Sequence, residues 1–140
     1  MNIKYAAAFA RLLLGIIFLM QGFGKVFTWG VSNVYNNGFK AYEETFLPSF
    51  LIKFTAYFTS YGELICGLLL ILGLFRKQAY LILAAILVIV SFGHGLQSPI
   101  WDLQHVFVRS VLLIFLMMVP LEKDVFTLDA LMGSKKKKEV

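Results

Sequence analysis

The chain has 140 residues, of which 59% are hydrophobic and only 15% are charged, and its mean hydropathy is +0.78. An average soluble domain carries about 25% charged residues, so this composition excludes an ordinary water-soluble domain and predicts a membrane protein. The net charge of +5 comes largely from the run Lys135 to Lys138. A terminal run of this kind does not indicate nucleic-acid binding.

Four apolar stretches are long enough to cross a bilayer, because a helix needs about 20 residues to span a hydrocarbon core of about 30 Å. Their apolar runs are continuous and do not alternate with a period of two, which favours helices over strands. We therefore predict an all-α fold, an integral membrane four-helix bundle in residues 1–133 with a basic cytoplasmic tail in residues 134–140. The predicted spans are residues 6–28, 54–75, 79–98 and 104–121.

The first stretch resembles a signal peptide, since Lys4 precedes an apolar run. The run is longer than a signal peptide needs, and no small-residue cleavage site follows it, so we expect a retained helix. The positive-inside rule predicts that both termini are cytoplasmic. The basic residues of the predicted inner side are Lys4, Arg76, Lys77, Lys123 and Lys135 to Lys138, and those of the outer side are Lys40 and Lys53.

The long connection between the first two spans, residues 30–53, contains an amphipathic segment. Its apolar residues are spaced three or four apart, which is typical of a helix with one apolar face. Pro48 would break or restart that helix. The segment is either an interfacial packing helix or a lid over the mouth of the bundle. The apolar positions are Phe39, Tyr42, Phe46, Leu47 and Phe50, with Lys40, Glu43 and Glu44 on the other face.

Three charged residues, Lys25, Glu63 and Arg109, interrupt the apolar stretches. A charge at bilayer depth costs about 2.5 to 3.5 kcal/mol on insertion scales, so each needs a partner, water or a function. Helical spacing places Gln21 with Lys25 on one face and His105 with Arg109 on another. Either Glu63 neutralises Arg109 or Lys25 in a bridge that serves assembly alone, or these residues line a pocket in the outer half of the bundle.

His94 and His105 flank the short turn between the last two spans. They could ligate haem or a metal, form hydrogen bonds with substrate or with Glu63 and Asp102, or simply lie at the interface. Two histidines in a hairpin are weak evidence for ligation, so we predict no metal site and do not expect haem. The predicted substrate-binding residues are Gln21, Lys25, Glu63, His94, His105 and Arg109, and no catalytic residue is identified.

Other residues of the spans are assigned to packing. Arg11 lies near the inner end of the first span, where we expect its side chain to extend to the cytoplasmic headgroups. The single cysteine, Cys66, excludes thiol-disulfide exchange within the chain and is expected to be a packing residue. Small residues predict close helix contacts. They are Gly15 and Gly22 in the first span and Gly62, Gly67 and Gly73 in the second.

The first two spans resemble the DoxX family of small bacterial membrane proteins. The matching stretches are residues 11–18 (RLLLGIIF), 21–25 (QGFGK) and 62–76 (GELICGLLLILGLFR). This resemblance implies a four-helix protein of the bacterial inner membrane, sometimes linked to redox chemistry. The family name comes from a subunit associated with quinone-coupled oxidation of sulfur compounds. The resemblance does not extend to His94, His105 or Arg109.

We therefore consider three functions. The first is a redox-associated subunit, in the extreme case part of a quinone-linked oxidoreductase, whose pocket binds a quinone or a small anion, because cations outnumber carboxylates there. The second is a non-catalytic membrane anchor or assembly partner with a structural ion cluster. The third is a small-solute transporter. The expected partners are the lipid bilayer, a membrane or periplasmic redox protein, and further copies of the chain in a homo-oligomer.

Overall fold

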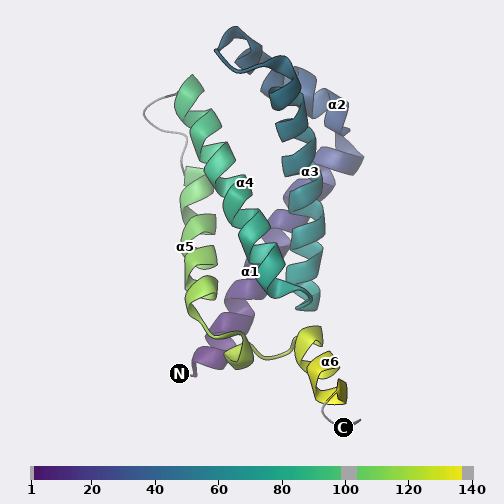
Figure 1. The fold of residues 1–140 in the computed structure, drawn as a ribbon, viewed down its shortest axis with the longest axis vertical. Coiled ribbons are helices and arrows are strands. Elements are labelled where there is room, and N and C mark those ends of the chain that lie inside the picture. The colour runs from purple at the N-terminus through teal and green to yellow at the C-terminus, as the bar shows by residue number, and fades with distance from the viewer. Residues whose placement is uncertain (1, 99–103, 137–140) are drawn as a thin grey trace.

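A computed structural model describes the backbone of residues 2–98 and 104–136 and the side chains of residues 2–98 and 106–132 (Figure 1). Within these residues all regular structure is helical, and no strand is present. The predicted all-α fold class is confirmed. The four main helices are α1 (Ile3–Phe23), α3 (Ser49–Leu72), α4 (Arg76–Gln97) and α5 (Gln104–Met118).

Shorter helical elements connect and extend these four. The π-helix η1 (Gly24–Thr28) continues α1 without a break. The loop after it contains α2, η2 and η3, and the segment after α5 contains η4 and α6. Their bounds are α2 Val31–Val34, η2 Tyr35–Phe39, η3 Lys40–Glu44, η4 Leu121–Lys123 and α6 Leu128–Lys136.

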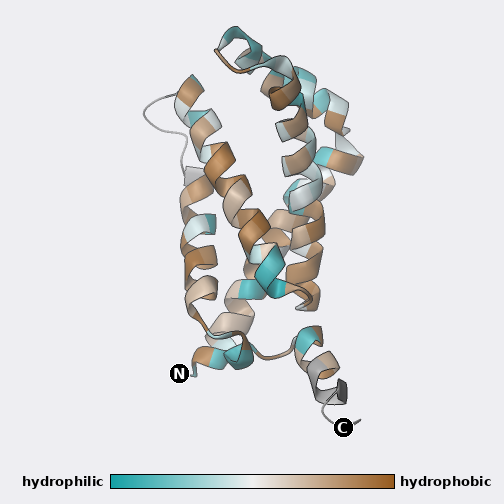
Figure 2. Cartoon of the chain, viewed as in Figure 1, coloured by the Kyte–Doolittle hydropathy of each residue, from teal (hydrophilic) through white to brown (hydrophobic). Residues whose placement is uncertain are grey.

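Three helical stretches are long and apolar enough to cross a membrane, namely Ile3–Thr28, Ser49–Leu72 and Arg76–Gln97. Helix α5 is apolar but has only 15 residues, which gives a length of about 22 Å. It ends at Met118 rather than at the predicted residue 121, because Pro120 cannot continue a helix. Figure 2 shows hydrophobic residues along all four helices, with hydrophilic residues gathered mainly toward the two ends of the bundle.

The four helices form a closed ring in which α1 and α4 each contact both α3 and α5. The start of α1 lies at the same end as η4 and α6, and we call this the terminal end (Figure 1). The opposite end, which carries α2, η2 and η3, is called the loop end. The buried core between the helices includes Leu14, Phe18, Leu70, Leu83 and Ile86.

Helices α1 and α3 approach each other so closely that their backbones touch. A Cβ atom added to Gly22 would lie 2.3 Å from the backbone nitrogen of Leu64, and one added to Gly67 would lie 2.3 Å from that of Leu19. The prediction that small residues permit close helix contact is therefore confirmed here. This contact brings the end of α1 against the middle of α3.

The amphipathic segment predicted between the first two spans is not one continuous helix, and Pro48 interrupts it as expected. The predicted apolar positions run from Phe39 to Phe50. This stretch contains the last residue of η2, all of η3 and the first residues of α3. Phe46 and Phe50 are 77% and 75% exposed, so they do not form an apolar face against the bundle. Pro48 precedes the first residue of α3, and the helix therefore begins five residues earlier than expected. The segment still reaches α4, because the Tyr42 hydroxyl lies beside Gly93, and its burial raises the pKa of Tyr42.

Candidate functional site

Four polar residues from three helices meet inside the bundle, and we call Gln21, Lys25, Glu63 and Arg109 the Glu63 cluster. Lys25 Nζ lies 2.7 Å from Glu63 Oε2. The Glu63 side chain is 1% exposed and that of Lys25 is 17% exposed. The sequence left Arg109 and Lys25 open as partners of Glu63, and the structure shows an ion pair with Lys25.

Local backbone structure explains how Lys25 meets Glu63. Gly22 lets α1 touch α3 at Leu64, next to Glu63, so the two helices are closest where the ion pair forms. Lys25 itself lies in the π-helix η1, directly after α1. Short π-helical segments are often found at functional sites.

Arg109 brings α5 into the cluster. Its NH1 group donates a hydrogen bond to Gln21 Oε1 at 2.5 Å, and its guanidinium carbon lies 5.7 Å from the centre of the Phe18 ring. That distance permits a cation–π contact. Arg109 is 8% exposed and close enough to Glu63 for the two charges to attract each other. Sequence reasoning did not identify Phe18 as a partner of Arg109.

Of the two predicted histidines, the structure describes the side chain of His94 alone. His94 is half-buried on α4, and the side chain of His105 lies outside the described residues, as does Asp102. Among the described residues, no group of three or more histidine, cysteine or acidic side chains could hold a metal ion. Cys66 is buried in the core of the bundle.

A second polar cluster, which we call the Asp124 network, lies at the terminal end and consists of Arg11, Arg76, Asp124 and Asp129. Arg11 is completely buried, and its Nε lies 2.8 Å from Asp124 Oδ2. The prediction that Arg11 extends to the headgroups is therefore wrong. Its other guanidinium nitrogens donate hydrogen bonds to the backbone carbonyls of Leu70, Ile71, Val125 and Phe126.

Arg76 completes the Asp124 network from the start of α4. Its NH1 group lies 3.1 Å from Asp124 Oδ2, and its Nε lies 3.1 Å from Asp129 Oδ2. The NH1 group also donates a hydrogen bond to the carbonyl of Leu121. Sequence reasoning assigned Arg76 to topology and did not consider the two aspartates. A usable signal was present, since both acids follow the last apolar stretch and so lie at the same end as Arg11 and Arg76.

Two hollows are described in the structure, and both lie at the terminal end, away from the Glu63 cluster. The larger, of about 490 Å³, is apolar and lies between the end of α3 and the start of α6. The smaller, of about 410 Å³, is bordered by the Asp124 network. Its lining residues are Arg76, Leu121, Glu122, Asp124, Asp129 and Ala130.

Comparison with known proteins identifies one family. The family model described as DoxX matches residues 6–95. The matched region contains α3, all but the first residues of α1 and all but the last residues of α4, and therefore Gln21, Lys25 and Glu63, while Arg109 lies beyond it. No curated protein and no solved structure matches the chain.

Proposed function

The chain belongs to the DoxX family of membrane proteins, and on that premise we propose that it is a redox-associated membrane subunit. Its Glu63 cluster would bind an oxygen acceptor, either the carbonyl of a quinone headgroup or a small anion. The redox part of this proposal draws on the resemblance to a family with members linked to quinone-coupled oxidation. The binding part draws on the geometry of the cluster.

The observation that carries the proposal is the charge imbalance inside the bundle. Within the part of the chain that the structure describes, the Glu63 cluster holds two cations, Lys25 and Arg109, and one carboxylate, Glu63. Excess positive charge in a site of low dielectric favours an acceptor oxygen or an anion. The Lys25 side chain is 17% exposed whereas that of Glu63 is 1% exposed, so the ammonium is the group that an incoming ligand would meet first.

Each residue then has a distinct role. Lys25 would donate a hydrogen bond to the ligand oxygen, since an ammonium carries three donors and the ion pair with Glu63 uses one. Glu63 would balance the charge and hold Lys25 in position. Gln21 and Phe18 would fix the guanidinium of Arg109, which would supply the second positive charge.

The experiment is a titration of the full chain in nanodiscs with ubiquinone and menaquinone analogues and, separately, with sulfate as a small oxyanion. Saturable binding of one of them is expected. Lys25→Gln should weaken that binding roughly 10- to 100-fold, the equivalent of one charge-assisted hydrogen bond. Lys53→Gln, which removes an equal charge outside the cluster, should leave it unchanged. Absence of saturable binding for all three ligand classes would remove the proposed site.

A second function, a non-catalytic membrane anchor or assembly partner, is favoured by one specific observation. Glu63 is almost fully buried and already paired, as a purely structural ion pair would be. Glu63→Gln separates the two functions when stability and ligand binding are measured on the same samples. Capture of a stoichiometric membrane partner by this variant, with unchanged ligand titrations, would favour the anchor.

A further inference from the structure

The smaller hollow at the terminal end, of about 410 Å³, is bordered by charged side chains. Its charged lining residues are Arg76, Glu122, Asp124 and Asp129. Arg76 pairs with both aspartates, and Arg11 also pairs with Asp124, so the Asp124 network is balanced in charge. Glu122 is exposed and takes no part in these ion pairs. Its carboxylate therefore adds a negative charge to the hollow that the network does not neutralise.

One oxygen of the buried Asp124 carboxylate lacks a donor. Asp124 Oδ2 accepts hydrogen bonds from Arg11 and Arg76. Asp124 Oδ1 is also buried, but among the described residues it has no hydrogen-bond partner. A buried charged acceptor without a donor is unfavourable and rare in native proteins. Because Asp124 lines the hollow, a donor group bound there would satisfy this oxygen.

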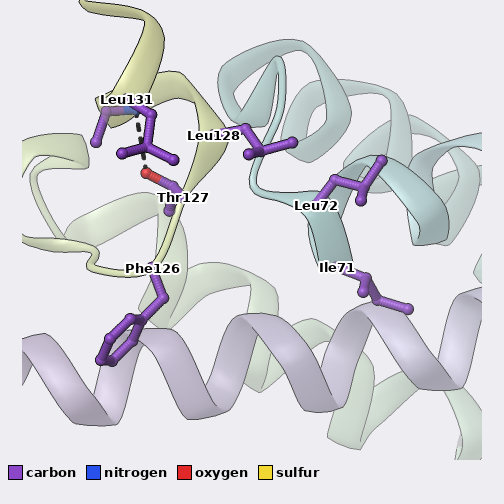
Figure 3. A pocket seen from close by; sticks show the side chains of 7 residues that line it. Ile71, Leu72, Phe126, Thr127, Leu128 and Leu131 are labelled. Carbon is purple, nitrogen blue, oxygen red and sulfur yellow. Dashed lines mark hydrogen bonds between the residues drawn. The ribbon is translucent and has the colours of Figure 1, made fainter. Parts of the chain in front are cut away.

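The wall of the hollow that α6 provides is fixed to the bundle. The backbone nitrogen of Asp129 donates to the carbonyl of Gly73, and the Asp129 carboxylate accepts from the backbone nitrogen of Phe75. Thr127 Oγ1 accepts a hydrogen bond from the backbone nitrogen of Ala130 (Figure 3). Ala130 borders both hollows. The smaller hollow is therefore formed before any ligand binds.

We propose that this hollow binds a primary ammonium group, with Asp124 Oδ1 and the carboxylate of Glu122 accepting hydrogen bonds from it. An ammonium carries one positive charge and three donors. The charge matches the excess negative charge of the hollow, and the donors match the acceptor that lacks one. The volume of about 410 Å³ is far larger than the roughly 30 Å³ of one water molecule, so it admits an amine of several heavy atoms.

The chemistry of the lining favours an ammonium over other ligands. Among the described residues, no group of three or more histidine, cysteine or acidic side chains could hold a metal ion. An anion would meet three carboxylates and one guanidinium in the lining. A quaternary ammonium has the charge but no N–H group for Asp124 Oδ1. Two sources supply a primary ammonium at this end of a membrane protein, namely a phosphatidylethanolamine headgroup and a free amine.

The experiment has one arm for each source. The full chain in detergent is titrated by calorimetry with ethanolamine and with tetramethylammonium, which has the same charge and no N–H group. If the source is a free amine, ethanolamine should bind roughly 10-fold more tightly, the equivalent of one hydrogen bond to a charged group. Native mass spectrometry compares retention of phosphatidylethanolamine and phosphatidylcholine, which differ in the same way. Preferential retention of phosphatidylethanolamine that ethanolamine does not displace identifies the lipid as the source.

Variants then test the acceptors. Glu122→Gln leaves the ion pairs intact and should weaken binding of the primary ammonium about two- to fivefold. Glu44→Gln removes an equal exposed charge at the loop end and should leave it unchanged. Asp124→Asn should abolish the preference for N–H donors. Because it also weakens the pairs with Arg11 and Arg76, a thermal melt accompanies it, and Glu122→Gln decides if it unfolds. No preference for a primary ammonium from either source, or unchanged binding in Glu122→Gln, would overturn the proposal.

Discussion

The two buried polar clusters of this protein differ in their balance of positive and negative charge. The Asp124 network has two arginines and two aspartates, joined by three ion pairs and by hydrogen bonds to backbone carbonyls. The Glu63 cluster has two cations and one carboxylate, with one ion pair among the described contacts. Arg11 in α1 belongs to the first cluster and Lys25 in η1 to the second. These two residues lie about 21 Å apart along the helix for a rise of 1.5 Å per residue.

This difference in charge balance predicts different roles for the two clusters. A balanced network with carbonyl partners holds segments together, and Arg11 does so for α1, the end of α3 and the segment after η4. In the Glu63 cluster the Lys25 side chain is 17% exposed, and its ammonium has donors beyond the one that pairs with Glu63. We therefore expect substitutions in the first cluster to act mainly on stability and those in the second to act mainly on binding.

The largest effect is expected for Arg11→Met. It leaves Asp124 with one ion pair and removes all hydrogen bonds from Arg11 to backbone carbonyls, so the free energy of unfolding should fall by about 3 to 5 kcal/mol. Denaturation in mild detergent measures this change. Arg11→Lys keeps the charge but not the guanidinium fork and should be intermediate. A loss below 1 kcal/mol in Arg11→Met would show that the network is not a stabilising element.

Gly22→Ala should have the next largest effect. The added methyl group would overlap the backbone of Leu64, so α1 and α3 must move apart, and we expect a loss of about 1 to 3 kcal/mol. Gly24→Ala is the matched control, because a Cβ there meets no atom within 4 Å. Equal melting temperatures for the two variants would contradict the close helix contact.

A smaller effect is expected for the ion pair of the Glu63 cluster. In a double-mutant cycle of Lys25→Met and Glu63→Gln, the coupling free energy should be about 0.6 to 1.7 kcal/mol, the range of interhelical polar contacts in membranes. The cycle compares the free energies of unfolding of the unsubstituted chain, the two single variants and the double variant. A coupling as large as that of a fully buried ion pair would move this cluster into the structural class with the Asp124 network.

The smallest effect concerns the exposed loop, outside both clusters. The hydrogen bond from the Tyr35 hydroxyl to Glu43 raises the pKa of Tyr35 above its ordinary value of 10.0. A raised pKa means that this contact contributes below pH 10 and is lost as the pH rises through the raised value. Glu43→Gln should lower the pKa of Tyr35 toward 10, as followed by tyrosinate absorbance. An unchanged titration curve would show that the contact is absent in solution.

Much of the Glu63 cluster could be predicted because a charge in an apolar run has few alternatives. Helical spacing then placed Gln21 and Lys25 on one face of the first span, and both belong to the cluster. The partner of Arg11 was missed because it lies 113 residues away in sequence. Position near a helix end indicated that Arg11 could extend to the headgroups, whereas tertiary contacts supply a buried aspartate instead.

The four main helices lie close to the predicted spans, and the segments between and after them differ more from the prediction. The three- and four-residue spacing from Phe39 to Phe50 indicated an amphipathic helix, but Pro48 divides this stretch, and its last residues belong to α3. Helix α6 was not predicted, because its polar contacts with Gly73 and Phe75 come from a distant turn and leave no periodic signal in the sequence. Only its last residues fall in the predicted basic tail.

The backbone contact between α1 and α3 also determines how the bundle can move. Glycines let these two helices touch over several turns, whereas α5 joins the ring through fewer contacts, so we expect α1 and α3 to move as one rigid unit. Lys25 and Glu63 both belong to the rigid unit, and Arg109 does not. Tilting of α5 would therefore open the bundle by separating Arg109 from Gln21 first and would leave the Lys25–Glu63 pair intact on the stationary half.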